Sequence, residues 1–163
     1  MGRLYYITGG AGSGKSEYAE QLAERLHAEL AGPLYYVATM NPAPRDSDAA
    51  ARIAKHQTRR AGRGYTTIEC PTDIAQLRTQ ASKNAVFLLE DLTNLYANEI
   101  YGTSGHPHEI VAPLLELAQQ GGALIIVANE LYSDGITYAP ETATFLRDLA
   151  GLAAELSTAA DQV

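Results

Sequence analysis

The sequence predicts an α/β fold, a three-layer sandwich with a mostly parallel central sheet. Short apolar runs rich in β-branched and aromatic residues recur along the chain, and longer helical patterns lie between most of them. The first run leads into a glycine-rich segment and then an amphipathic pattern, which is the order of a strand–loop–helix unit. The 163 residues, 46% of them hydrophobic, can bury one core, so we expect a single domain over residues 1–163.

Five strands are expected from the apolar runs, because each run is short and most end in turn-forming or polar residues. The strands are expected over Leu4–Thr8, Leu34–Thr39, Thr66–Cys70, Ala85–Glu90 and Leu124–Asn129. Helical segments between them would cover a parallel sheet and connect its strands.

The first helix is expected directly after the glycines, where apolar residues recur every four positions from Tyr18 to Leu30. Gly32-Pro33 is a helix stop signal. A second helix is expected over residues 48–60, and a last one over about residues 141–160. The glycines at 62 and 64 would end the second helix.

Charge and composition exclude several classes of function. The formal net charge of −7 and the pI near 5.0 argue against a general nucleic-acid binder, which needs clustered Lys and Arg. Cys70 is the single cysteine, and no apolar run is long enough for membrane insertion. We therefore expect a cytoplasmic protein that catches anionic ligands at a local positive site.

The segment Gly9–Ser16 reads GGAGSGKS and matches the phosphate-binding P-loop. Glycines let backbone N–H groups curl around phosphate oxygens, Lys15 reaches the β and γ phosphates, and the Ser16 hydroxyl can ligate Mg²⁺. The strand before the motif and the helix after it are both expected, so the motif predicts a nucleoside triphosphate bound with Mg²⁺. It does not identify the reaction.

Acidic residues end the central strand, where Glu90 and Asp91 follow an apolar run. A P-loop protein places a carboxylate there beside Mg²⁺, and either residue could serve. Successive strand residues point to opposite faces, so we expect only one of the two to face the nucleotide. Asn129 and Glu130 end the last strand and are expected near the same site.

His56 lies in a basic segment, and on a helix Arg52, His56 and Arg59 or Arg60 would share one face. Nearby positive charges disfavour the imidazolium, which lowers the histidine pKa and leaves a nitrogen lone pair free to attack phosphorus. From the residues alone, a solvated basic helix face is the more frequent explanation of such a pattern.

Taken in order, GGAGSGKS, LYYVAT, ARIAKH, TIEC, FLLEDLTN, ANEL and RDLAG resemble one family over essentially the whole chain. The family is that of the bifunctional adenosylcobinamide kinase and adenosylcobinamide-phosphate guanylyltransferase of cobalamin biosynthesis. The resemblance implies a P-loop NTPase-like (RecA-like) fold, ATP and GTP as substrates with Mg²⁺, and a corrinoid substrate. It also implies a homo-oligomer, a trimer in the family, and transfer of GMP through a guanylylated histidine.

Carried over by position, the resemblance makes His56 the guanylylated residue and Lys15 the other catalytic residue. It implies Mg²⁺ ligation by Ser16 and Glu90, with Asp91 as the alternative. The nucleotide-binding residues that it implies are Gly9, Gly10, Ala11, Gly12, Ser13, Gly14, Lys15, Ser16, Thr39, Met40, Arg60, Glu69 and Glu90.

The sequence departs from the family pattern in three places, of which the last two concern substrate handling more than nucleotide chemistry. Asp91 stands where the family often has cysteine, residues 131–134 replace common glycines, and the following helix is expected to be shorter. Family members also typically continue into one more strand after the position of Val163, so either the sequence is shortened there or the sheet is short of a C-terminal edge strand. Two alternatives stay open: a P-loop small-molecule kinase without a histidine intermediate, and a non-catalytic nucleotide-binding regulator.

Overall fold

The computed structural model describes residues 2–10, 12–40, 54, 57–58, 60–102, 106–129 and 140–163. Its sheet has five parallel strands in the order β1-β5-β4-β2-β3. The strands are β1 (Arg3–Gly9), β2 (Leu34–Ala38), β3 (Tyr65–Glu69), β4 (Val86–Glu90) and β5 (Ala123–Asn129). The expected strands are confirmed, each within a residue of its predicted ends.

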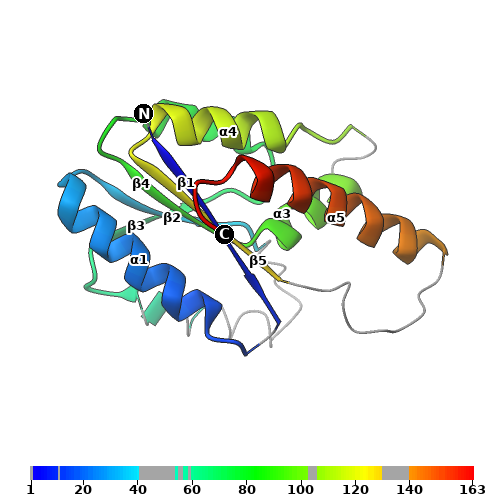
Figure 1. Cartoon of the computed structure of the whole chain (residues 1–163), viewed down its shortest axis with the longest axis horizontal. Coiled ribbons are helices and arrows are strands. Elements are labelled where there is room, and N and C mark those ends of the chain that lie inside the picture. The colour runs from blue at the N-terminus through cyan, green and yellow to red at the C-terminus, as the bar shows by residue number, and fades with distance from the viewer. Residues whose placement is uncertain are drawn as a thin grey trace.

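Helices cover both faces of the sheet and complete the expected three layers (Figure 1). Among the helical elements whose bounds the structure describes, α1 (Lys15–Leu30) packs on one face of the sheet, and four others pack on the opposite face. These are η1 (Ile74–Gln80, a 3₁₀ helix), α3 (Leu92–Gly102), α4 (Val111–Gln120) and α5 (Pro140–Ala159). The expected α/β three-layer class with a parallel central sheet is thus confirmed, with helices at α3 and α4 that the patterns indicated only in general terms.

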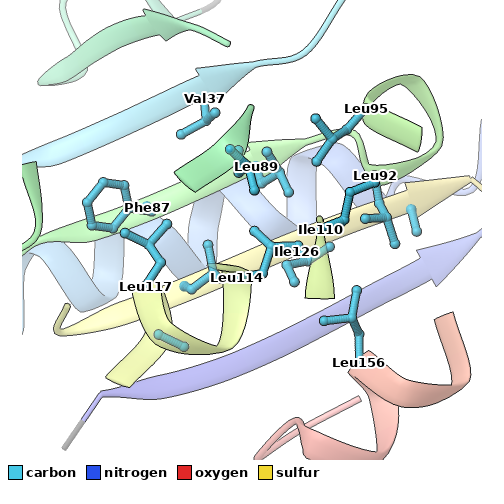
Figure 2. Packing of buried hydrophobic residues seen from close by; sticks show 14 of the residues in the cluster. Val37, Phe87, Leu89, Leu92, Leu95, Ile110, Leu114, Leu117, Ile126 and Leu156 are labelled. Carbon is cyan, nitrogen blue, oxygen red and sulfur yellow. The ribbon is translucent and has the colours of Figure 1, made fainter. Parts of the chain in front are cut away.

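The period of two along each strand divides the core into two clusters. In β4, Val86 and Leu88 pack with α1, while Phe87 and Leu89 pack toward α3, α4 and α5. Figure 2 shows the second cluster, where Val37 and Ile126 of the sheet lie with helical residues such as Leu114. The side chains of residues 86–89 in β4 are all fully buried, as expected for a parallel strand with helices on both faces.

The end of α1 differs in detail from the sequence expectation. The helix ends at Leu30, and the left-handed position after it is taken by Ala31 at φ 55° instead of Gly32. Gly32 is needed for another reason, since a Cβ there would lie 2.3 Å from the backbone oxygen of Asn84. The Gly-Pro stop signal thus located the helix end correctly, and Ala31 is the residue that turns the chain.

β1 is one edge strand of the sheet, and β3 is the other. Tyr5 forms an isolated parallel bridge with Gln162, and the Tyr6 amide donates to the Gln162 oxygen at 2.9 Å. The predicted helix over residues 48–60 lies largely outside the described residues, although 54, 57, 58 and 60 are helical.

Candidate functional site

The carboxyl ends of all five strands meet at one edge of the sheet. Gly9 aligns with Asn129, and Ala38 aligns with both Glu69 and Glu90. Ligands of open α/β sheets bind outside this edge, because loops and helix N-termini gather there. The register therefore brings the glycine loop and the predicted acidic residues to the same end of the sheet.

The glycine loop turns directly from β1 into α1. Gly12 and Gly14 have φ values of 75° and 82°, a left-handed conformation that side chains with a Cβ rarely adopt. Lys15 is the first residue of α1, and its Nζ donates a hydrogen bond to the Gly10 oxygen at 3.2 Å. The N-terminus of α1 thus points its unpaired N–H groups at the loop, as anion binding requires. Ala11 lies outside the described residues.

A pocket of about 230 Å³ opens where these elements meet. It is lined by residues of the glycine loop, the strand ends and the segment around residues 57–60. The lining residues are Lys15, Ser16, Tyr36, Ala38, Met40, Gln57, Arg60, Thr67, Glu69, Glu90, Asp91, Asn94, Val127 and Asn129. Eight predicted residues, namely Lys15, Ser16, Met40, Arg60, Glu69, Glu90, Asp91 and Asn129, share this pocket.

The other described residues of the glycine loop do not line this pocket. Gly9, Ser13 and Gly14 line a second hollow along β1, and Lys15 borders both hollows. Gly10 and Gly12 border neither, and a Cβ on either of them would meet no atom within 4 Å.

Both acidic residues at the end of β4 line the pocket, so the expectation that only one would face it is wrong. Alternation holds only inside a strand, and β4 ends at Glu90. Asp91 lies in the turn before α3, where its Oδ1 accepts the Asn94 amide at 2.7 Å as a helix cap. The chain therefore presents two adjacent carboxylates to one site.

The two carboxylates differ in environment. Asp91 also accepts a hydrogen bond from Asn129 Nδ2, and burial raises its pKa, while the Asn94 amide opposes the shift. Glu90 accepts the Tyr36 hydroxyl at Oε2, at 2.5 Å, and its buried Oε1 has no hydrogen-bond partner. Only Glu90 thus has a carboxylate oxygen left unoccupied by the described residues.

Thr39 was one of the residues predicted to bind the nucleotide. Its side chain is fully buried and does not line the pocket. Its hydroxyl donates to the Asp91 carbonyl oxygen and accepts the Asp91 amide, both at 2.8 Å. A buried hydroxyl needs such partners, so the Thr39 side chain acts on the site by holding the backbone of Asp91.

Arg60 ends the described helical residues before β3, and it is buried with 5% of its surface exposed. Its guanidinium carbon lies 3.3 Å from the centre of the Tyr36 ring, a cation–π contact. Nε and Nη1 of Arg60 have no hydrogen-bond partner among the described residues. A buried cation with free donors, lining a pocket beside Lys15, can bind phosphate oxygens.

The predicted guanylylated residue, His56, lies outside the described residues, as do Arg52, Arg59 and Glu130. Gln57, the next residue after His56, lines the pocket. In the described part of the chain, no group of three or more His, Cys, Asp and Glu side chains is arranged to hold a metal ion.

Sequence reasoning missed Tyr36 and Asn94. Tyr36 faces the pocket from inside β2, and its position matters only because β2 pairs with β4. That pairing is long-range and leaves no local pattern. Asn94 had a weak local signal, since an Asp three residues before it is a common helix cap.

Comparison with known proteins identifies a family. Residues 5–163 match the family described as cobinamide kinase / cobinamide phosphate guanyltransferase. The bifunctional adenosylcobalamin biosynthesis protein CobP of Pseudomonas aeruginosa is 35% identical over 130 residues, which are 76% of this chain and 69% of that protein. The bifunctional adenosylcobalamin biosynthesis protein CobU of Escherichia coli is 28% identical over 176 residues, covering 98% of this chain and 93% of that protein.

A solved structure, the flagellar accessory protein FlaH from Methanocaldococcus jannaschii, aligns with a TM-score of 0.45 and 13% identity over 90% of this chain and 67% of that chain.

No helix within the described residues combines the length and the apolar character needed to span a bilayer.

Proposed function

Since the chain belongs to the cobinamide kinase / cobinamide phosphate guanyltransferase family, we propose that its single described nucleotide pocket serves both of the family's reactions. The chain is a bifunctional transferase of adenosylcobalamin biosynthesis, a cobinamide kinase and a cobinamide phosphate guanylyltransferase. The observation that carries the proposal is the convergence of the glycine-loop lysine, two carboxylates and a buried arginine on one pocket.

In the kinase step, a hydroxyl of cobinamide attacks the γ-phosphorus of ATP or GTP. The new P–O bond forms as the bond to the β-phosphate oxygen breaks, and a nucleoside diphosphate leaves. Lys15, which lines the pocket, and the N-terminus of α1 would stabilise the charge that develops on the phosphates. A carboxylate at the end of β4 can accept the hydroxyl proton.

Mg²⁺ fits the donors that this pocket contains. Hard cations prefer oxygen ligands, and the Ser16 hydroxyl and the unpartnered Glu90 Oε1 are both oxygen donors bordering the pocket. We propose Ser16 and Glu90 as its ligands, with Asp91 close by as a second carboxylate. Bound there, Mg²⁺ would neutralise phosphate charge.

In the second step, we propose that a nitrogen of His56 attacks the α-phosphorus of GTP. A P–N bond forms, pyrophosphate leaves, and the phosphate of cobinamide phosphate then displaces the imidazole to give a P–O–P linkage. Two features support this proposal. Gln57, which follows His56, lines the pocket, and Arg60 offers free N–H donors to the phosphates. Lys15 would stabilise the departing pyrophosphate.

Further proposals concern the setting of the enzyme. We propose the adenosylated corrinoid as the substrate, the homo-oligomer that the family resemblance implies, and action in the cytoplasm, where both triphosphates are supplied. A single domain over residues 1–163 also stays a proposal.

A two-label experiment tests the proposed function. The purified chain is incubated with cobinamide, Mg²⁺ and GTP labelled either at the γ- or at the α-phosphorus. We expect γ label in cobinamide phosphate first and α label in the cobinamide nucleotide later. Transfer of γ label without any transfer of α label would leave only a small-molecule kinase, and transfer of neither would favour a non-catalytic regulator.

A further inference from the structure

Tyr36 lies between two oppositely charged side chains of the pocket. Its hydroxyl donates to Glu90 Oε2 at 2.5 Å, and the Arg60 guanidinium covers its ring at 3.3 Å. Tyr65 meets the same ring edge-on, with the ring centres 6.2 Å apart. Tyr36 is 5% exposed, so its ring is held on several sides.

The two charged side chains beside Tyr36, those of Arg60 and Glu90, are not paired with each other in the described part of the chain. A buried arginine and a buried carboxylate attract strongly where the effective dielectric constant is low, and they ordinarily form an ion pair. Here, within the described residues, Arg60 and Glu90 form no ion pair, and each keeps polar atoms without a hydrogen-bond partner. Both line the pocket, so the unsatisfied atoms are available to a ligand.

We propose that Tyr36 is a positioning residue for the nucleotide chemistry: it holds Glu90 by its hydroxyl and Arg60 by its ring face, and so keeps the two charges separate. Glu90 is then free for Mg²⁺, and Arg60 is free for phosphate oxygens. The inference rests on the proposed function of the pocket and adds to it a residue that contributes two different contacts.

The fold explains how one side chain can make both contacts. Tyr36 is in β2, between β3 and β4, and Ala38 of β2 aligns with Glu90. The Tyr36 hydroxyl therefore reaches Glu90 at the end of the neighbouring strand β4. The face of its ring contacts the guanidinium of Arg60, a residue that precedes β3 in the sequence. A tyrosine hydroxyl, with its ordinary pKa of about 10, is protonated at neutral pH and can donate the hydrogen bond to Glu90.

Two substitutions separate the contacts. Tyr36→Phe removes the hydroxyl and keeps the ring, whereas Tyr36→Leu removes both. Tyr35→Phe and Tyr35→Leu are matched controls, because Tyr35 is the preceding residue of β2 and stacks on Phe87, with ring centres 5.1 Å apart, in the other core cluster. Each variant is measured for melting temperature, for the dissociation constant of GTP without Mg²⁺, and for the Mg²⁺ concentration that gives half-maximal kinase activity.

We expect Tyr36→Phe to bind Mg²⁺-free GTP within about twofold of wild type and to need about tenfold more Mg²⁺, as the loss of a hydrogen bond to a charged group implies. Tyr36→Leu should in addition bind GTP about tenfold more weakly, because Arg60 loses its platform. A merely structural role of Tyr36 would lower the melting temperature. It would not make Tyr36→Phe change the Mg²⁺ dependence alone and Tyr36→Leu change both the Mg²⁺ dependence and the GTP affinity.

Several results would overturn the inference. Wild-type Mg²⁺ dependence in Tyr36→Phe contradicts the Glu90 contact, and equal GTP affinity in Tyr36→Leu and Tyr36→Phe contradicts the Arg60 contact. If Tyr36→Leu fails to fold, Arg60→Lys replaces it, since lysine keeps the charge and loses the planar stacking group. Equal effects in the Tyr35 controls overturn both contacts. An inactive wild-type chain would instead contradict the proposed function.

Discussion

Asn129 donates a hydrogen bond from Nδ2 to Asp91 Oδ2 at 2.8 Å, which links the end of β5 to the residue that follows β4. Together with the Asn94 amide on Oδ1, this bond occupies both oxygens of Asp91. Glu90 has only one oxygen so occupied, by Tyr36. Two adjacent carboxylates are therefore unequal: Asp91 is held by its own protein, and Glu90 is the one available to a ligand.

This difference between the two carboxylates predicts that replacing each by its isosteric amide has a different effect on Mg²⁺ dependence. Glu90→Gln should raise the Mg²⁺ concentration for half-maximal activity about 100-fold, and Asp91→Asn about tenfold or less, because outer-shell groups around a metal typically matter less than its ligands. Kinase activity measured against Mg²⁺ concentration checks this. Glu116→Gln, at an exposed position of α4, is the control and should match wild type. A larger effect of Asp91→Asn would reverse the assignment.

Removing the loop cation should impair both reactions, since both need a bound triphosphate. We expect Lys15→Ala to lower the rate of γ-phosphoryl and of guanylyl transfer by at least about 100-fold. Lys83→Ala is the matched control, because Lys83 is exposed and lies just before β4, at the amino end of that strand. Loss of one activity with retention of the other would show that the two reactions do not share this pocket.

The single cysteine predicts a loss of stability at alkaline pH. Burial raises the pKa of the Cys70 thiol, so the unfolded chain releases this proton at lower pH than the folded chain. The stabilising contribution is complete below the unfolded pKa of about 8.5 and is lost as pH rises toward the folded pKa.

Denaturant titrations of wild type and Cys70→Ala at several pH values measure this contribution. The difference in their free energies of unfolding should shrink as pH rises above about 8.5, because the alanine variant has no thiol to ionise. Other titrating groups are common to both proteins and cancel. A difference that stays constant with pH would contradict the shift.

The left-handed residue after α1 offers a stabilising substitution. Ala31→Gly should raise the free energy of unfolding by about 0.5–1 kcal/mol, because glycine adopts φ 55° without the steric cost that alanine bears. Ala28→Gly, at an exposed position inside α1, should lower stability by about 0.5–1 kcal/mol. Thermal or denaturant unfolding distinguishes the two signs, and destabilisation by both would refute the argument.

Local patterns were sufficient for the fold class and for part of the site. Continuous apolar runs such as Val86–Leu89 are typical of a strand covered on both faces, and the glycine loop lies between a strand and a helix as its motif demands. The family assignment, made from ordered motifs along the chain, is confirmed by the match over residues 5–163.

The remaining features depend on contacts between distant segments. The pairing of β2 with β4 determines that Tyr36 reaches Glu90, and no pattern within either strand records that pairing. Strand alternation predicts that only one of Glu90 and Asp91 faces the pocket, and this fails because the chain leaves the strand at Glu90. Thr39 was assigned by position in the family, whereas its hydroxyl is used by the Asp91 backbone.

The histidine intermediate is the central claim, and trapping it is the most direct test. The chain is incubated with α-labelled GTP and Mg²⁺ without cobinamide, then denatured, and label bound to protein is counted after acid and after alkali. We predict acid-labile, alkali-stable label on wild type and on the control His106→Ala, and none on His56→Ala, since a P–N bond to imidazole hydrolyses readily in acid. Label that persists on His56→Ala, or no label on wild type, would contradict the mechanism.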